Sequence, residues 1–167
     1  MQVTDIFEYA MKMETDGRDF YLRQAAKADQ KQFKQIWEQL ADDELKHFHI
    51  FKALRDGQAA EYKEGSATPI LATARNVFED LKAAGRDFTF AGDVEKAWVE
   101  AREVERRSEE FYRDKATQVE TEGKRTILNR IADEEHKHFV TLDNVIHFLR
   151  RPKEWLEDAE WRHSDEY

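Results

Sequence analysis

The fold is decided by Leu40-Ala41-Asp42-Asp43-Glu44-Leu45-Lys46-His47-Phe48, a segment that recurs 91 positions later as Ile131-Ala132-Asp133-Glu134-Glu135-His136-Lys137-His138-Phe139. Both copies contain a glutamate followed three residues later by a histidine, Glu44 with His47 and Glu135 with His138. Residues three or four apart lie on one face of an α-helix. The pattern therefore predicts two helices that each turn a carboxylate and an imidazole in the same direction.

A second pair of segments repeats at the same offset. Residues 10–21 align with residues 101–112 without a gap, and an alanine, a glutamate, a phenylalanine and a tyrosine recur at matching places. The matching pairs are Ala10/Ala101, Glu14/Glu105, Phe20/Phe111 and Tyr21/Tyr112. One register serves both blocks, so we expect each half of the chain to be a helix pair and the whole to be a duplicated helical hairpin.

The boundaries follow from residues that start or stop helices. Gly57 ends the second helix, Asp93 is a suitable N-cap for the third, and Pro152 ends the fourth. Only six Gly and two Pro interrupt the chain, which favours long helices. We expect a single all-α domain over residues 1–167, a four-helix bundle with helices at about 4–28, 30–55, 93–119 and 122–150.

Two further segments lie outside the four helices. The long crossover, residues 57–92, joins the two hairpins, and Pro69 is expected to start a short helix in it through Leu71, Val77, Phe78 and Leu81. The tail, residues 152–167, carries Trp155, Leu156 and Trp161. We expect a short C-terminal helix there that packs on its own bundle or on a partner, and from this tail we predict a homodimer or another small homo-oligomer.

Composition excludes several classes of function. The net charge of −9 argues against nucleic acid and against anionic membrane surfaces, and no apolar run is long enough for a membrane span. The chain has no Cys, so disulfides, iron–sulfur clusters and cysteine nucleophiles are excluded. The first ten residues lack the basic-then-apolar pattern of a signal peptide, and we expect a cytoplasmic protein.

Each predicted helix carries acidic residues in the middle of an otherwise apolar stripe. These acids are Glu14 in the first helix, Glu44 in the second, Glu105 in the third and Glu135 in the fourth. The second and fourth helices add His47 and His138. One Glu-x-x-His in so acidic a chain is usually a solvated surface feature, but two in register with two further glutamates are not. Four buried carboxylates are costly unless cations balance them, and two divalent ions supply the matching charge. Oxygen ligands with imidazole suit iron or manganese, with zinc as a substitute.

Neighbouring residues on the same stripes suggest supporting roles. Tyr21 and Tyr112 lie two turns beyond Glu14 and Glu105, where they either hydrogen-bond a ligand carboxylate or are ordinary core tyrosines. Gly17 and Ser108 lie one turn beyond the same glutamates, where they leave room for a small oxidant or allow close helix packing. The remaining histidines lie off the stripes or in the tail and are expected at the surface: His49, His136, His147 and His163.

These residues resemble the rubrerythrin and ferritin-like di-iron carboxylate proteins, and the resemblance covers all four long helices. It implies a ferritin-like bundle that binds two iron ions. By this resemblance Glu14 and Glu105 are terminal ligands, Glu44 and Glu135 bridge the metals, and His47 and His138 each bind one iron. Rubrerythrins also usually carry a cysteine-ligated rubredoxin-like domain, which this sequence lacks. The resemblance therefore implies an external electron donor, such as a rubredoxin or another redox protein.

The resemblance implies an oxidoreductase that reduces peroxide or dioxygen at the dinuclear site. Rubrerythrins carry a further glutamate on the third helix, whereas this sequence has Arg102 and Ser108 one turn from Glu105, and Glu109 is the only nearby acid at helical spacing. That departure moves the site closer to a ferritin-type iron oxidase. The alternatives are therefore a ferroxidase for iron storage or delivery, a di-iron hydroxylase, and a metal-binding module without catalytic activity.

Overall fold

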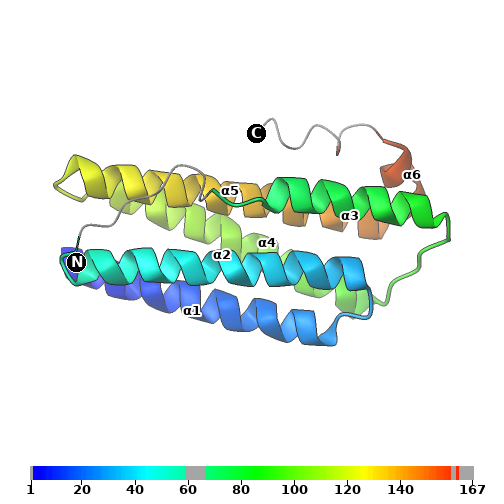
Figure 1. The fold of residues 1–167 in the computed structure, drawn as a ribbon, viewed down its shortest axis with the longest axis horizontal. Coiled ribbons are helices and arrows are strands. Elements are labelled where there is room, and N and C mark those ends of the chain that lie inside the picture. Colours follow the sequence, from blue (N-terminus) through cyan, green and yellow to red (C-terminus); the bar gives the residue numbers. More distant parts are fainter. Residues whose placement is uncertain (1, 59–66, 159–160, 162–167) are drawn as a thin grey trace.

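The computed structural model describes residues 2–58, 67–158 and 161, and over these residues it contains helices and no strand. The helices are α1 (Val3–Lys27), α2 (Lys31–Arg55), α3 (Ile70–Ala84), α4 (Gly92–Ala116), α5 (Glu122–Arg150) and α6 (Pro152–Glu157). Figure 1 shows the four long helices side by side, with the α1–α2 hairpin next to the α4–α5 hairpin. The predicted all-α ferritin-like bundle of two hairpins is confirmed.

Helix α3 occupies the crossover between the two hairpins. It packs against α2 and α5, so it bridges the halves of the bundle, and α6 packs on α3 and α5 (Figure 1). Ile70, Val77 and Phe78 lie on its buried face. Gly85 ends the helix with φ +60°, a left-handed conformation that glycine adopts without steric cost. The short helix predicted after Pro69 is therefore present.

Two features predicted for the third long helix need correction. α4 begins at Gly92 with Ala91 at the N-cap, so Asp93 lies inside the first turn, where its charge favours the helix N-terminus without a capping hydrogen bond. α4 also ends at Ala116 rather than Val119, because Val119 turns into the apolar core from the connecting loop. The bounds of α1, α2 and α5 agree with the approximate ranges predicted for them to within one residue.

The bundle core consists of two apolar clusters separated along the helices. One cluster contains Tyr21, Trp37, Trp98 and Leu142. The other contains residues from the opposite half of each long helix, among them Phe7, Phe51, Tyr112 and Leu128. On every long helix the two clusters are separated by the Glu or Glu-x-x-His positions. A polar layer therefore lies across the middle of an otherwise apolar core.

The C-terminal residues pack on their own bundle. Trp155, Leu156 and Trp161 are buried, and the ring of Phe78 lies 5.5 Å from that of Trp155 and 5.7 Å from that of Trp161. The predicted short C-terminal helix is present as α6. Since these side chains are already covered by α3 and α5, they no longer argue for a homodimer, which stays a prediction.

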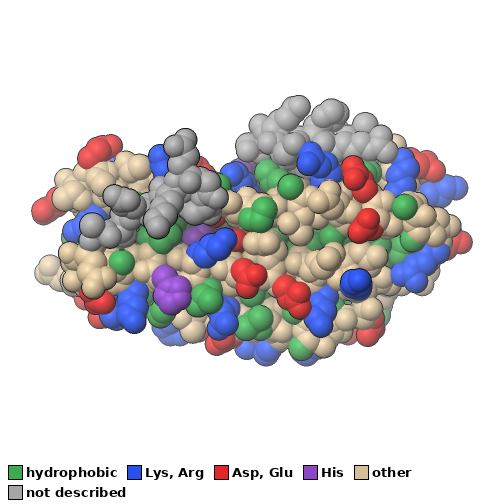
Figure 2. Space-filling model, viewed as in Figure 1, with side chains coloured by type: hydrophobic (Ala, Val, Ile, Leu, Met, Phe, Trp, Pro, Cys, Tyr) green, Lys and Arg blue, Asp and Glu red, His purple; other side chains and the backbone are tan. Residues whose placement is uncertain are grey.

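The surface agrees with an acidic chain that carries many charges of both signs. Figure 2 shows Lys, Arg, Asp and Glu side chains interspersed over one face, with hydrophobic side chains scattered between them. Among the described helices, none combines the length and the hydropathy needed to cross a bilayer.

Candidate metal centre

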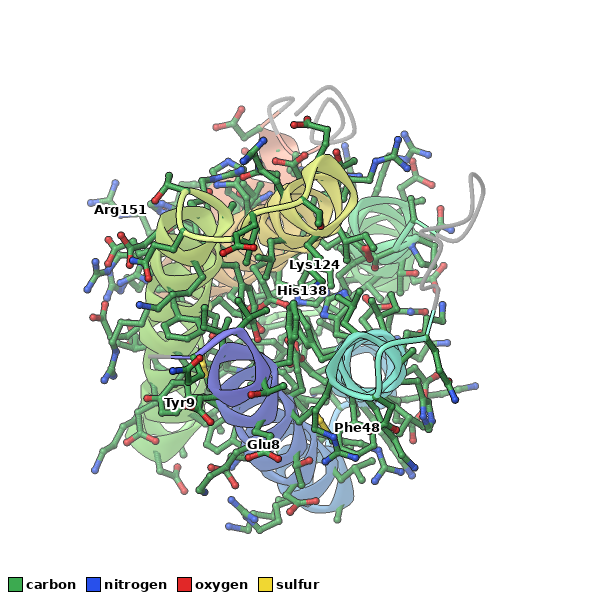
Figure 3. The ribbon with its side chains drawn as sticks, turned by 90° about the vertical axis from the view of Figure 1, so that its left-hand side faces the viewer. Glu8, Tyr9, Phe48, Lys124, His138 and Arg151 are labelled. Carbon is green, nitrogen blue, oxygen red and sulfur yellow. The ribbon has the colours of Figure 1, made fainter. Side chains whose placement is uncertain are left out.

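The polar layer is built from six side chains, called here the candidate ligands. One carboxylate comes from α1, one from α4, and a carboxylate with an imidazole from each of α2 and α5. All are at most 4% exposed, and they are Glu14, Glu44, His47, Glu105, Glu135 and His138. Figure 3 shows His138 in the interior of the bundle, between the helices, whereas Glu8 lies on the outside. The structure thus brings together every residue that the repeat predicted for the site.

The candidate ligands form two overlapping groups. Glu14, Glu44, His47 and Glu135 place one donor atom each within 4.8 Å of one another, and so do Glu44, Glu105, Glu135 and His138. Glu44 and Glu135 belong to both groups. Two cations held in this way would lie next to each other and share these two carboxylates, which is the arrangement that the resemblance implies.

Several ligand atoms of this layer have no hydrogen-bond partner within the protein. Each candidate ligand has a buried nitrogen or oxygen without a hydrogen bond, for example Oε2 of Glu14, Oε1 of Glu44 and Nδ1 of His138. Buried polar atoms without partners are costly, and native proteins rarely leave several in one place. A cluster of carboxylate oxygens and imidazole nitrogens is a chemically suitable set for two divalent ions. The residues present therefore fit a dinuclear metal site.

Two tyrosines hold the carboxylates of α1 and α4 from across the bundle. The Tyr112 hydroxyl donates a hydrogen bond to Oε1 of Glu14 at 2.6 Å, and the Tyr21 hydroxyl donates to Oε1 of Glu105. Each bond therefore joins one half of the repeat to the other. Burial, followed by the nearby carboxylates, raises the pKa of both phenols well above 10.0. Both hydroxyls thus keep their protons and act as donors, the first of the two roles considered for these tyrosines.

A second ring of polar groups, missed by the sequence analysis, lies outside the histidines. Asp43 on α2 accepts a hydrogen bond from Nε2 of His138 on α5, at 2.9 Å. Glu134 on α5 lies 3.5 Å from Nε2 of His47 on α2. We call Asp43 and Glu134 the outer carboxylates. They occupy equivalent positions of the repeat, each just before a candidate glutamate, and that spacing is the signal in the sequence from which they were predictable.

The outer carboxylates determine how the imidazoles are oriented. Nδ1 of His47 faces Glu135 Oε1 at 3.0 Å, and Nδ1 of His138 faces Glu105 Oε1 at 3.3 Å. Since an ionised carboxylate only accepts hydrogen bonds, Nε2 of His138 carries the proton towards Asp43. When the imidazole is neutral, that tautomer leaves Nδ1 as the lone-pair nitrogen inside the polar layer, which is the state that metal coordination requires.

Crowding of like charges shifts the acidity of the layer. Burial, followed by the neighbouring glutamates, raises the pKa of Glu44 and of Glu135 well above 4.5. Burial alone would lower the pKa of His47 and of His138, but the surrounding carboxylates outweigh it, and both values are raised well above 6.5. Without metal, the layer therefore holds protons that reduce its charge.

An open groove of about 400 Å³ lies between α1 and α4 and reaches the edge of the polar layer. Gly17 and Ser108 line it, together with Tyr9 and Val104, which are 50% and 43% exposed. A Cβ at Gly17 would lie 3.2 Å from Oε2 of Glu44. Both interpretations of these small residues thus have support, because the helices pack closely here and the groove opens beside them.

The other histidines lie away from the layer. His49 and His147 are exposed, as predicted. His136 is only half-exposed, because its Nδ1 lies 3.1 Å from Oε2 of Glu109. His163 falls outside the described residues. Glu109 pairs with His136 and Arg113 and is not part of the polar layer.

The helices and the layer together define a ferritin-like bundle with a buried carboxylate–histidine cluster. The family model described as Rubrerythrin matches residues 5–146, a range that reaches all four long helices. The chain belongs to the rubrerythrin family, whose members bind two iron ions. No curated protein and no solved structure gives a significant match.

The two overlapping groups predict a stoichiometry of two metal ions per chain. Glu44→Ala or Glu135→Ala should reduce it to one ion or none, because each of these carboxylates is shared by both groups. Metal analysis after anaerobic reconstitution with Fe²⁺ or Mn²⁺ measures the ratio. His49→Ala is the matched control for His47→Ala, and equal damage from both substitutions would contradict the assignment of faces on α2.

The raised pKa values predict that the metal-free protein loses stability as the pH rises. A group whose folded pKa lies above its unfolded value stabilises the fold below the unfolded value and stops doing so above the folded value. This applies to His47, His138, Glu44 and Glu135. The lowered pKa of Glu105, buried but facing His138, acts in the opposite sense only in more acidic solution.

Between about pH 5.5 and about pH 8 the melting temperature of the metal-free protein should therefore fall, and the increase on adding Mn²⁺ should be larger at the higher pH. Calorimetry of both forms measures this. Protonated histidines compete with metal at low pH, so the metal-free curve is the decisive one. A flat or rising curve would contradict the mutual repulsion of the buried carboxylates.

Proposed function

We propose that the protein is a di-iron oxidoreductase that reduces hydrogen peroxide, with electrons from an external one-electron donor such as a rubredoxin. The observation that carries this proposal is the pair of overlapping donor groups, which share Glu44 and Glu135 and contain unpartnered buried atoms. Such a site suits two adjacent ions that act together on one small oxidant. A structural ion needs only one such group.

The reaction balances with two ferrous ions and no other cofactor. When bound, the two irons supply one electron each, so that the O–O bond of one hydrogen peroxide breaks, two protons are taken up, and two waters leave. The external donor then returns the two electrons singly. Family membership supports an iron site, and the choice of peroxide over dioxygen is part of this proposal.

The protein's own residues orient the donors and exclude water. Tyr112 and Tyr21 each hold one oxygen of a terminal carboxylate, which leaves the other oxygen of Glu14 and of Glu105 unpartnered in the layer. The apolar clusters on both sides keep the layer dry, so its charges interact more strongly than in water. Such preorganisation reduces the rearrangement needed when the metals change charge.

The groove between α1 and α4 is the proposed path for the oxidant. Two small residues, Gly17 and Ser108, line it, and a Cβ at Gly17 would lie 3.2 Å from Oε2 of Glu44. Its rim contains Arg23 and Arg107 beside exposed Tyr9, whose ring lies 5.0 Å from that of Phe111 on α4. A groove of this size admits peroxide or dioxygen.

The alternative function is a ferroxidase that oxidises iron for storage or delivery, as the lack of a further glutamate near Glu105 suggests. Ser108 and Arg102 are the neighbours one turn away, and Arg102 binds Asp143 with 2.7 Å between Nη1 and Oδ1. No acid on α4 therefore joins the layer besides Glu105 within the described residues. The two functions differ in their preferred oxidant and in the fate of the iron.

Anaerobic loading with Fe²⁺, followed by separate additions of hydrogen peroxide and dioxygen, distinguishes them. We expect peroxide to oxidise both irons faster than dioxygen does, with one peroxide consumed per two irons, and the iron to remain bound. Stopped-flow absorbance and metal analysis after gel filtration measure these quantities. Faster reaction with dioxygen, with release of ferric iron or its accumulation beyond two ions per chain, would favour the ferroxidase.

Gly17→Ala tests the proposed path. The added methyl group would meet Oε2 of Glu44 at 3.2 Å, so we expect slower oxidation by peroxide and weaker binding of the metal pair. Gly123→Ala in the first turn of α5 is the control, because it adds the same methyl group where nothing lies within 4 Å of the Cβ. Equal peroxide rates in the two variants would rule out this part of the groove as the path.

A further inference from the structure

One residue of the crossover contacts both outer carboxylates. Thr68, just before α3, donates from its backbone N–H to Oε1 of Glu134 at 3.1 Å, and its hydroxyl donates to Oδ2 of Asp43. The same hydroxyl accepts from the N–H of Ile70 at 3.1 Å. Thr68 is only 8% exposed, and all three bonds lie in the interior.

These bonds complete a continuous connection between the two imidazoles. Asp43 contacts His138, Glu134 contacts His47, and Thr68 joins Asp43 to Glu134. Asp43 on α2 contacts His138 on α5, and Glu134 on α5 contacts His47 on α2, so each contact joins the two hairpins. The outer carboxylates occupy equivalent positions of the repeat, but Thr68 comes from the crossover and has no equivalent in the repeat.

We infer that Thr68 is a positioning residue that fixes both histidines for metal binding and links the crossover to the two metal positions. The inference rests on the proposed metal centre. A carboxylate that is itself held by a donor has less freedom to rotate, and so does the imidazole that it holds. Oδ1 of Asp43 is held separately by Nε2 of Gln39, at 3.0 Å, so the Thr68 hydroxyl completes the restraint on Oδ2.

Co²⁺ is a suitable probe, because its visible absorption reports ligand geometry as well as occupancy. Thr68→Val keeps the shape and the backbone N–H but removes the hydroxyl. We expect it to weaken Co²⁺ binding by about tenfold, the lower end of the range for lost outer hydrogen bonds to metal ligands, and to change the absorption of the bound ion. Thr68→Ser keeps the hydroxyl and should restore both properties.

The matched control is Thr73→Val, the same substitution on a half-buried residue of α3 that makes no hydrogen bond with either outer carboxylate. It should leave Co²⁺ affinity and absorption unchanged. Asp43→Asn combined with Thr68→Val should bind Co²⁺ no more weakly than Asp43→Asn alone, because both changes act through one contact. Additive losses would overturn the inference.

Thr68 also accepts a hydrogen bond from the backbone N–H of Ile70, the first residue of α3, so a purely structural role must be separated from positioning. A structural role alone would lower the melting temperature of the metal-free Thr68→Val protein and leave Co²⁺ affinity and absorption unchanged, which would overturn the inference. Wild-type protein that binds no Co²⁺ would instead contradict the metal centre itself. The two failures are therefore distinguishable.

A measurement on the unmodified chain covers the case in which Thr68→Val does not fold. Amide hydrogen exchange is compared with and without Zn²⁺, a diamagnetic probe. Since ordering His47 also orders Glu134, exchange of the Thr68 N–H should slow when Zn²⁺ binds, by more than that of the Thr73 N–H, which donates to Pro69 O at 2.9 Å. Equal changes at the two amides would count against the inference.

Discussion

The structure depends on the burial of four carboxylates and two imidazoles in one layer between two apolar clusters. Burying these charges costs more free energy than the surrounding apolar contacts supply, unless opposite charges or protons balance them. Protons balance part of the charge in the metal-free protein, and two divalent ions would balance the four glutamates of the layer. The hydrogen bonds from Tyr21 and Tyr112, and the outer carboxylates, serve to keep donor atoms pointing at the same volume. The apolar clusters exclude the water that would otherwise screen them.

The tyrosines and the outer carboxylates connect the two hairpins by hydrogen bonds, which constrain the helices in ways that apolar packing does not. Tyr112 reaches from α4 to Glu14, and Asp43 reaches from α2 to His138 on α5. Hydrophobic contacts tolerate small sliding movements, whereas hydrogen bonds to buried charged groups depend steeply on distance and angle. The polar layer therefore sets the register of the helices, and the clusters on either side supply most of the favourable free energy.

Much of this was predictable from the sequence, because the duplication provides an internal comparison. The six candidate ligands stand out since each is polar on an apolar stripe and recurs in the other half. Asp43 and Glu134 escaped notice because an acid next to a helical stripe usually points to solvent, and only the fold shows that these reach the opposite hairpin. Thr68 carries no periodic signal at all, since its role arises from where the crossover passes. The ends of α4 were misjudged because Val119 fills the core from a loop.

The two halves of the site are related by the repeat, but they are not equivalent. Asp43 holds His138 at 2.9 Å, whereas Glu134, with a side chain longer by one methylene, lies 3.5 Å from His47. A rigid imidazole loses less freedom on coordination than a loosely held one. Filling of the pair is therefore expected to be sequential, with the ion beside His138 entering first. Two identical hairpins would have no such order, so the differences between the two halves of the repeat distinguish the two proposed metal positions.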